Sequence, residues 1–221
     1  MFDTRPAPHT RDMAGIAREL AAEIRALRQA SRRMPRPVTW DWASQHVLPL
    51  LAGALADAPG ERVVRAIAEP GCVVEFGLWI DDALPVVDAL VAERWECTAA
   101  QIWAAAFANL RRRAAEIDPA EVTEASFDGR IVRISDARPW TASLVLVPDQ
   151  LMRLFGEHDQ LIAAPGRSLL VSLDPATPAS AAADVIIGLE MSQAHPLALD
   201  PFVLSGGHLY WPAGEEHRAG F

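Results

Sequence analysis

Apolar residues near the start of the chain recur at the spacing of an α-helix. Within residues 10–33 they follow one another at steps of three and four, which predicts one amphipathic helix: Met13, Ile16, Leu20, Ile24 and Leu27. Arginines repeat every seven residues on another face of this helix, at positions 11, 18, 25 and 32. Pro35 and Pro37 end it, because each forces the residue before it out of helical space. Residues 1–37 are therefore predicted to be a basic amphipathic helix with a proline-rich break, and residues 38–221 a single α+β domain.

The rest of the chain alternates between helical patterns and short β-branched runs. Helices are predicted over 41–58, with a bend at Pro49, over 98–116, with a capping box from Thr98 to Gln101, and over 149–155 and 179–191. Strands are predicted at 63–67, 72–80, 129–134, 143–147, 161–173 and 202–211, the last as a hairpin around Gly206-Gly207. This order predicts an α+β fold, with a mixed or mainly antiparallel sheet and helices packed on one face.

Composition and charge narrow the class of protein. Hydrophobic residues make up 51% of the chain, enough for a continuous core, while no apolar run is long enough for a membrane span or a signal peptide. We therefore expect a folded cytoplasmic protein. Residues 1–37 carry eight Arg and four acids, a net +4, and the remainder carries twelve Arg and twenty-five acids, a net −13. A body this acidic repels phosphate backbones, so nucleic acid is not an expected partner.

Two features of the amino-acid composition indicate no function. All twenty basic residues are Arg and Ala is abundant, which fits the coding bias of a high-GC bacterial genome. Cys72 and Cys97 form no Cys-x-x-Cys motif, so we expect reduced, structural thiols.

Motifs for phosphate and metal binding are absent from the sequence. It contains no glycine-rich loop of the Walker or dinucleotide type. Glu157-His158 has no second histidine one helical turn away, as a zinc peptidase needs. His195, His208 and His217 are thirteen and nine residues apart and could meet only through the fold. We therefore predict no metal and no cofactor.

Patterns for nucleophilic or acid–base catalysis are also absent. Ser205 lies near His208, but Val203 stands where a nucleophile elbow requires glycine. The acid pairs Asp81-Asp82 and Glu215-Glu216 are neighbours in sequence, and such carboxylates are usually solvated. The sequence identifies no catalytic residue.

Three stretches of the chain carry a resemblance to a known family. They are residues 73–110, with Ala-Ala-Phe-Ala-Asn-Leu at 105–110, residues 127–173, and residues 183–211, which end in a hairpin. In their order and spacing, residues 72–212 resemble the YtpQ-like proteins, an uncharacterised bacterial family of unknown function. The resemblance implies a fold but no mechanism, since that family has no assigned activity.

Three polar residues at predicted element ends are the candidate binding residues: Asn109, Ser143 and Arg167. Each also has a structural explanation. Asn109 can bond the backbone near a helix end, Ser143 can cap or pair across a strand, and Arg167 follows the Pro165-Gly166 turn.

Our leading hypothesis is a non-catalytic binding or regulatory module. It could form a homodimer through the helix at 10–33 or bind an unknown protein. The alternative is an enzyme of unrecognised type, such as a hydrolase; a concave pocket holding His195, His208 and a carboxylate within about 4 Å would favour it. An exposed apolar patch would favour the binding module. A third hypothesis is that the Arg-striped helix targets an acidic protein or a membrane surface.

Overall fold

The computed structural model describes residues 13–53, 66–69, 72–127, 130–135 and 138–210. The helices in these ranges are α1 (Met13–Arg33), α2 (Trp40–Ala43), α3 (Ala89–Glu93), α4 (Ala99–Ala115), α5 (Pro148–Phe155), α6 (Ala179–Glu190) and the 3-10 helices η1 (Pro119–Glu121) and η2 (Thr141–Leu146). The strands are β1 (Val47–Gly53), β2 (Ala66–Glu69), β3 (Cys72–Leu78), β4 (Thr123–Phe127), β5 (Arg130–Ser135), β6 (Gln160–Gly166), β7 (Leu169–Leu173), β8 (Phe202–Ser205) and β9 (His208–Tyr210).

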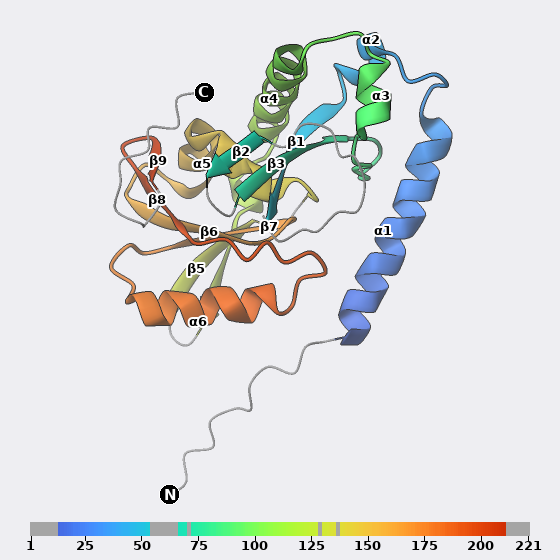
Figure 1. Ribbon diagram of the computed structural model, residues 1–221. Coiled ribbons are helices and arrows are strands. Elements are labelled where there is room, and N and C mark those ends of the chain that lie inside the picture. Colours follow the sequence, from blue (N-terminus) through green and yellow to red (C-terminus); the bar gives the residue numbers. More distant parts are fainter. Residues whose placement is uncertain (1–12, 54–65, 70–71, 128–129, 136–137, 211–221) are drawn as a thin grey trace, which may run out of the picture.

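These strands form two antiparallel sheets (Figure 1). One has three strands in the order β1-β3-β2, and the other has six in the order β4-β5-β7-β6-β8-β9. The α+β class and the antiparallel pairing are confirmed. Where one sheet with helices on one face was expected, the six-stranded sheet is covered on both faces.

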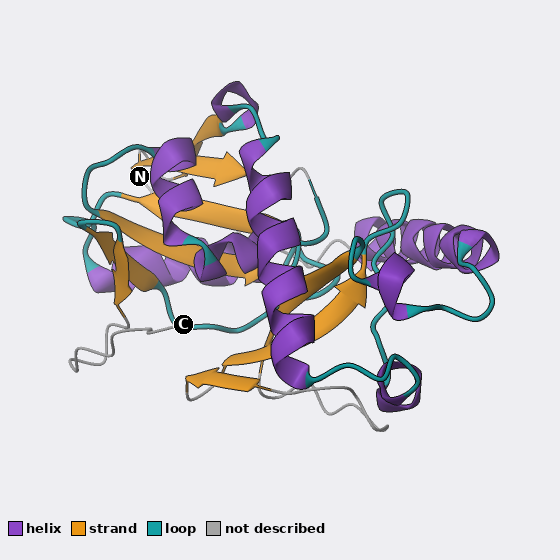
Figure 2. Ribbon diagram, turned by 90° about the horizontal axis from the view of Figure 1, so that it is seen from above, coloured by secondary structure: helices purple, strands orange, loops and turns teal. Residues whose placement is uncertain are grey.

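The central strands explain why both faces are covered. Ala163 and Val171 pack with α6 in one core, whereas Ile162 and Leu170 pack with α5 and η2 in another. Successive side chains of a strand point to opposite faces, so two strands that are apolar throughout need a cover on each side. Figure 2 shows α4 and α5 over the face opposite α6.

Two local motifs form as the sequence predicts. The Thr98 side chain accepts from the Gln101 N–H, and the Gln101 side chain accepts from the Thr98 N–H, so the capping box starts α4. Gly206 and Gly207 have φ of 55° and 81°, the positive values that a two-residue hairpin turn requires.

The helix predicted over 41–58 is wrong. One helical turn, α2, is followed at Val47 by β1, and residues 54–58 lie outside the described residues. The Trp79 N–H donates to the His46 carbonyl, so positions 46 and 79 are a hydrogen-bonded pair of the antiparallel ladder. Along such a ladder, hydrogen-bonded pairs alternate with pairs that have no hydrogen bond between the two strands. Residues 47, 49 and 51 therefore direct their backbone polar groups away from β3. Pro49 has no N–H to lose there, which is why this edge strand tolerates it.

The strand predicted at 143–147 is also wrong. Those residues belong mainly to η2, which packs against β1 and β7. The Ala142 N–H donates to the Arg167 carbonyl, and the Ser143 N–H donates to the Trp140 carbonyl. A short buried apolar run has the same composition in a strand and in a tight helical turn, so periodicity does not separate them.

Helix α1 packs against its own chain along one side of the molecule (Figure 1, Figure 2). Ile16 and Ala30 are buried, and Arg33 forms an ion pair with Asp81. The predicted apolar stripe is only partly covered, because Met13 is 63% exposed and Ile24 is 49% exposed. Arginines 18, 25 and 32 are exposed, while residues 10–12 lie outside the described residues. Among the described helices, none is both long and apolar enough to cross a membrane.

Candidate functional site

A groove of about 320 Å³ lies between α1 and the body of the protein. Its walls come from α1, from the turn after β3, from the segment before η2, from the turn between β6 and β7, and from the segment after α6. Acidic and basic side chains both line it: Glu19, Glu23, Asp82, Arg138, Arg167 and His195. It is a site of mixed apolar and charged lining, assembled from distant parts of the sequence.

A hydrogen bond between Glu23 and His195 crosses the groove. Nε2 of His195 lies 2.5 Å from Oε2 of Glu23, and the two side chains are 35% and 36% exposed. The hydrogen bond from His195 lowers the pKa of the Glu23 carboxyl, and the charges of His195 and Arg167 act in the same direction against the effect of burial. Glu23 is therefore ionised in this groove at neutral pH.

The backbone of Arg167 places its side chain next to His195. The Arg167 N–H donates to the His195 carbonyl at 3.2 Å, and Gly166 forms a β-bridge with Pro196. The Nε atom of Arg167 is buried and has no hydrogen-bond partner among the described residues. A buried donor of this kind is costly when unpaired, so it marks a place where an acceptor would be stabilised.

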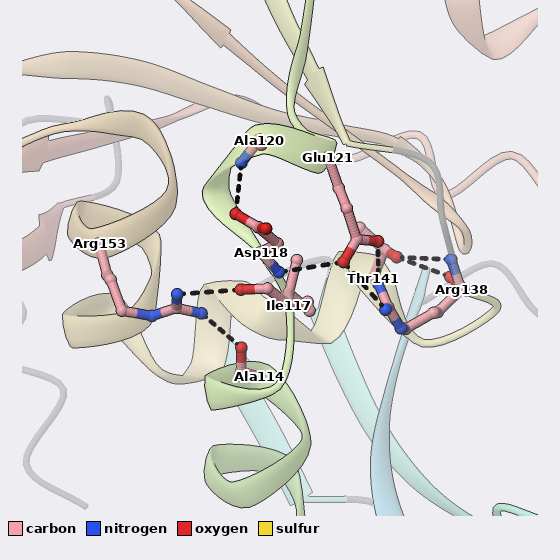
Figure 3. Close-up of polar contacts among 8 residues, drawn as sticks. All are labelled: Ala114, Ile117, Asp118, Ala120, Glu121, Arg138, Thr141 and Arg153. Carbon is pink, nitrogen blue, oxygen red and sulfur yellow. Dashed lines mark hydrogen bonds and ion pairs between the residues drawn. The ribbon is translucent and has the colours of Figure 1, made fainter.

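Arg138, the other arginine of the groove, is already paired (Figure 3). Its guanidinium contacts both carboxylate oxygens of Glu121, at 3.1 and 3.4 Å, and its carbonyl accepts from the Thr141 hydroxyl. The Asp118 N–H and the Arg138 side chain lower the pKa of the Glu121 carboxyl. Arg138 is therefore fixed and neutralised, whereas the buried Nε of Arg167 has no partner among the described residues.

Asn109 and Ser143 lie away from the groove and cover the outer edge of β1. Asn109 Nδ2 donates to the carbonyls of Ser44 and Val47, at 2.8 and 2.9 Å. The Leu51 N–H donates to the Ser143 hydroxyl at 3.0 Å. Both side chains satisfy backbone groups that point away from β3. Of the three candidate binding residues, Arg167 lines the groove and these two support a strand edge.

The fold brings His195 to a carboxylate but does not add His208. His208 is exposed on β9, where its ring lies 6.4 Å from that of Tyr210. His217 and Glu215-Glu216 lie outside the described residues. Within the described ranges, no group of three or more His, Cys, Asp or Glu residues is arranged to hold a metal ion. The carboxylate that meets His195 belongs to Glu23, a pairing that sequence reasoning missed because no local signal links positions 172 residues apart.

Comparison of the chain with protein-family models, with curated proteins and with solved structures found no match. The chemistry of the groove is therefore what indicates a function. It offers a guanidinium whose buried Nε has no partner among the described residues, an imidazole already bound to a carboxylate, and space for a small molecule.

Proposed function

We propose that this protein is a non-catalytic cytoplasmic binding module that holds a small anionic ligand in the groove beside α1. One observation carries the proposal: Arg167, whose buried Nε has no hydrogen-bond partner among the described residues, lines a groove beside a half-exposed His195. Guanidinium groups bind carboxylate and phosphate oxygens through charge-assisted hydrogen bonds. An oxyanion in the groove would supply the acceptor that Arg167 lacks.

A binding role also fits the state of His195. Its Nε2 is engaged by Glu23, and among the described residues no hydroxyl is hydrogen-bonded to the ring. A nucleophilic mechanism needs such a hydroxyl or thiol within reach of the base. The groove therefore has an element for holding an anion and lacks an assembled nucleophile in the described part of the chain.

Thermal melting with inorganic phosphate or succinate tests the proposal. A ligand at ten times its Kd stabilises the folded state by about 1.4 kcal/mol, which is a rise of roughly 3–6 °C for a chain of this size. The Arg167→Gln variant should lose this response. Arg94→Gln, which removes an exposed arginine outside the groove, should keep it. A response to neither anion, or an equal response in Arg167→Gln, would show that the groove is not the binding site.

A hydrolase is the second candidate, and the Glu23–His195 pair favours it. A carboxylate that orients an imidazole is the arrangement of a general base, which could activate a water molecule. Hydrolysis of p-nitrophenyl acetate by the wild type and by His195→Asn separates the two functions. The binding proposal predicts equal, background rates for both proteins. A rate that depends on His195 would favour the hydrolase.

The YtpQ-like resemblance and self-association stay predictions. The outer face of α1, with its exposed arginines and the exposed side chains of Met13 and Ile24, is a surface that a protein partner or a second copy could cover. Light scattering of the purified chain over a range of concentrations would show whether it dimerises.

A further inference from the structure

The face of α1 that docks on the body has a carboxylate at its centre. Ile16, Glu23 and Ala30 are spaced by seven residues, so they lie on one line along the helix. Ile16 is 7% exposed and Ala30 is fully buried, while the Glu23 side chain between them is 36% exposed and bonded to His195. The middle of this helix contact is therefore polar and open to solvent.

The two halves of α1 are held in different ways. Near the C-terminal end, Ala30 packs in a core with residues of β3 and α4, and Arg33 pairs with Asp81. Toward the N-terminal end, Ile16 is buried and Glu23 bonds to His195, while Met13 and Ile24 face solvent. Contacts between charged groups with this exposure contribute little to stability. The burial of Ile16 is therefore the main contact that release of the N-terminal half has to break.

The position taken by the Glu23 carboxylate also suits a carboxylate from outside the chain. Glu23 bonds to His195, and Arg167 attracts it only through its charge. The buried Nε of Arg167 is a second donor, which has no partner among the described residues and which Glu23 does not use. A ligand carboxylate that is not tethered to a helix could contact both His195 and Arg167.

We propose that Glu23 is an internal competitor, and that a carboxylate-bearing small molecule displaces it and releases the N-terminal half of α1 from the body. This inference rests on the proposed function, because it needs an anion in the groove. Displacement follows if the ligand binds the released state better than the docked state. The exposure of the inner face of α1 would then report that the groove is occupied.

Hydrogen–deuterium exchange with succinate as the probe tests the release. Saturating succinate should speed exchange of the α1 amides of residues 16–24 by at least about fivefold, because a released helix end frays. The amides of α4 should be unchanged and serve as an internal reference. A ligand that merely fills the groove would slow exchange around it instead.

Two variants complete the experiment. Glu23→Gln removes the competitor, so the α1 amides should exchange faster without ligand and succinate should bind about 3- to 10-fold more tightly. Glu93→Gln makes the same charge change at an exposed acid outside the groove and should alter the affinity by less than about twofold.

The outcomes separate the inference from the proposed function. Succinate binding without faster exchange in α1 overturns the inference alone, as does weaker binding by Glu23→Gln, which would make Glu23 part of the ligand's site. Phosphate binding without succinate binding also overturns the inference alone. A failure of both anions to bind overturns the inference together with the proposed function.

Discussion

Replacing Asn109 by alanine tests whether this side chain supports the fold. Its amide donates to the buried carbonyl of Val47 and to the half-buried carbonyl of Ser44. Loss of the donor should cost about 1–3 kcal/mol at the buried carbonyl and about 0.5–1.5 kcal/mol at the other, which water can reach. We expect Asn109→Ala to lower the free energy of unfolding by about 1.5–4.5 kcal/mol and the melting temperature by roughly 3–18 °C.

Asn109→Asp is the matched variant, because it keeps the shape and replaces the donor with an acceptor. A carboxylate facing two carbonyls should be at least as destabilising as alanine at neutral pH. Relative to the wild type at the same pH, its stability should partly recover when the carboxyl is protonated. Recovery would show that the missing donor, and not a change in volume, causes the loss.

Urea unfolding followed by tryptophan fluorescence measures these differences, and the anion response of each variant is measured beside it. Asn109→Ala should keep the response to phosphate or succinate in full, because Asn109 does not line the groove. If the free energy of unfolding of Asn109→Ala is less than about 1 kcal/mol below that of the wild type, the account of the β1 edge is refuted, because the loss of one buried hydrogen bond should cost more than this. A stable variant that no longer responds to the anion would make Asn109 a binding residue.

Three further predictions concern charged groups. The pKa of Glu23 is lowered in the folded state, so the stability that Glu23 contributes, about 0–1 kcal/mol for a half-exposed pair, is present above its unfolded pKa and is lost as the pH falls through its folded pKa. The difference in the free energy of unfolding between the wild type and Glu23→Gln, measured by urea titration, should therefore shrink on acidification. Burial raises the pKa of Glu190, so its ionised form destabilises the folded state at neutral pH. Glu190→Gln should therefore have a higher melting temperature than the wild type at pH 7 and the same melting temperature near pH 4, a pattern that calorimetry at both pH values checks. Arg153 donates to the carbonyls of Ala114 and Ile117 at 2.6 and 2.9 Å, so Arg153→Met should cost about 1–2 kcal/mol in urea unfolding, and no loss would mean that water caps the end of α4 equally well (Figure 3).

Local signals predicted the elements that local physics decides. The capping box at Thr98 and the glycine pair at 206–207 act through neighbouring residues, so both were readable from the sequence. Strand β1 was not, because Pro49 signals a break unless its place on an outward-facing edge is known. Strand β4 gave no signal at all, since Thr123–Phe127 is a mostly polar, exposed edge with one large apolar residue. Its pairing with β5 is what makes it a strand.

The candidate site shows the same division between local and distant causes. Arg167 was predictable as a polar residue beside a turn, although the turn lies at residues 167–168 and Pro165 and Gly166 end strand β6. The surroundings of Arg167 were not predictable. They depend on which face of α1 meets the body. The predicted stripe was Met13, Ile16, Leu20, Ile24 and Leu27, and of these the fold buries Ile16 but leaves Met13 and Ile24 exposed. The helix docks along the line of Ile16, Glu23 and Ala30, at one side of that stripe, and this brings Glu23 to His195. A helix docked with its whole apolar stripe inward would bury more apolar surface, so the observed docking gives up part of that burial and gains a polar contact in the groove.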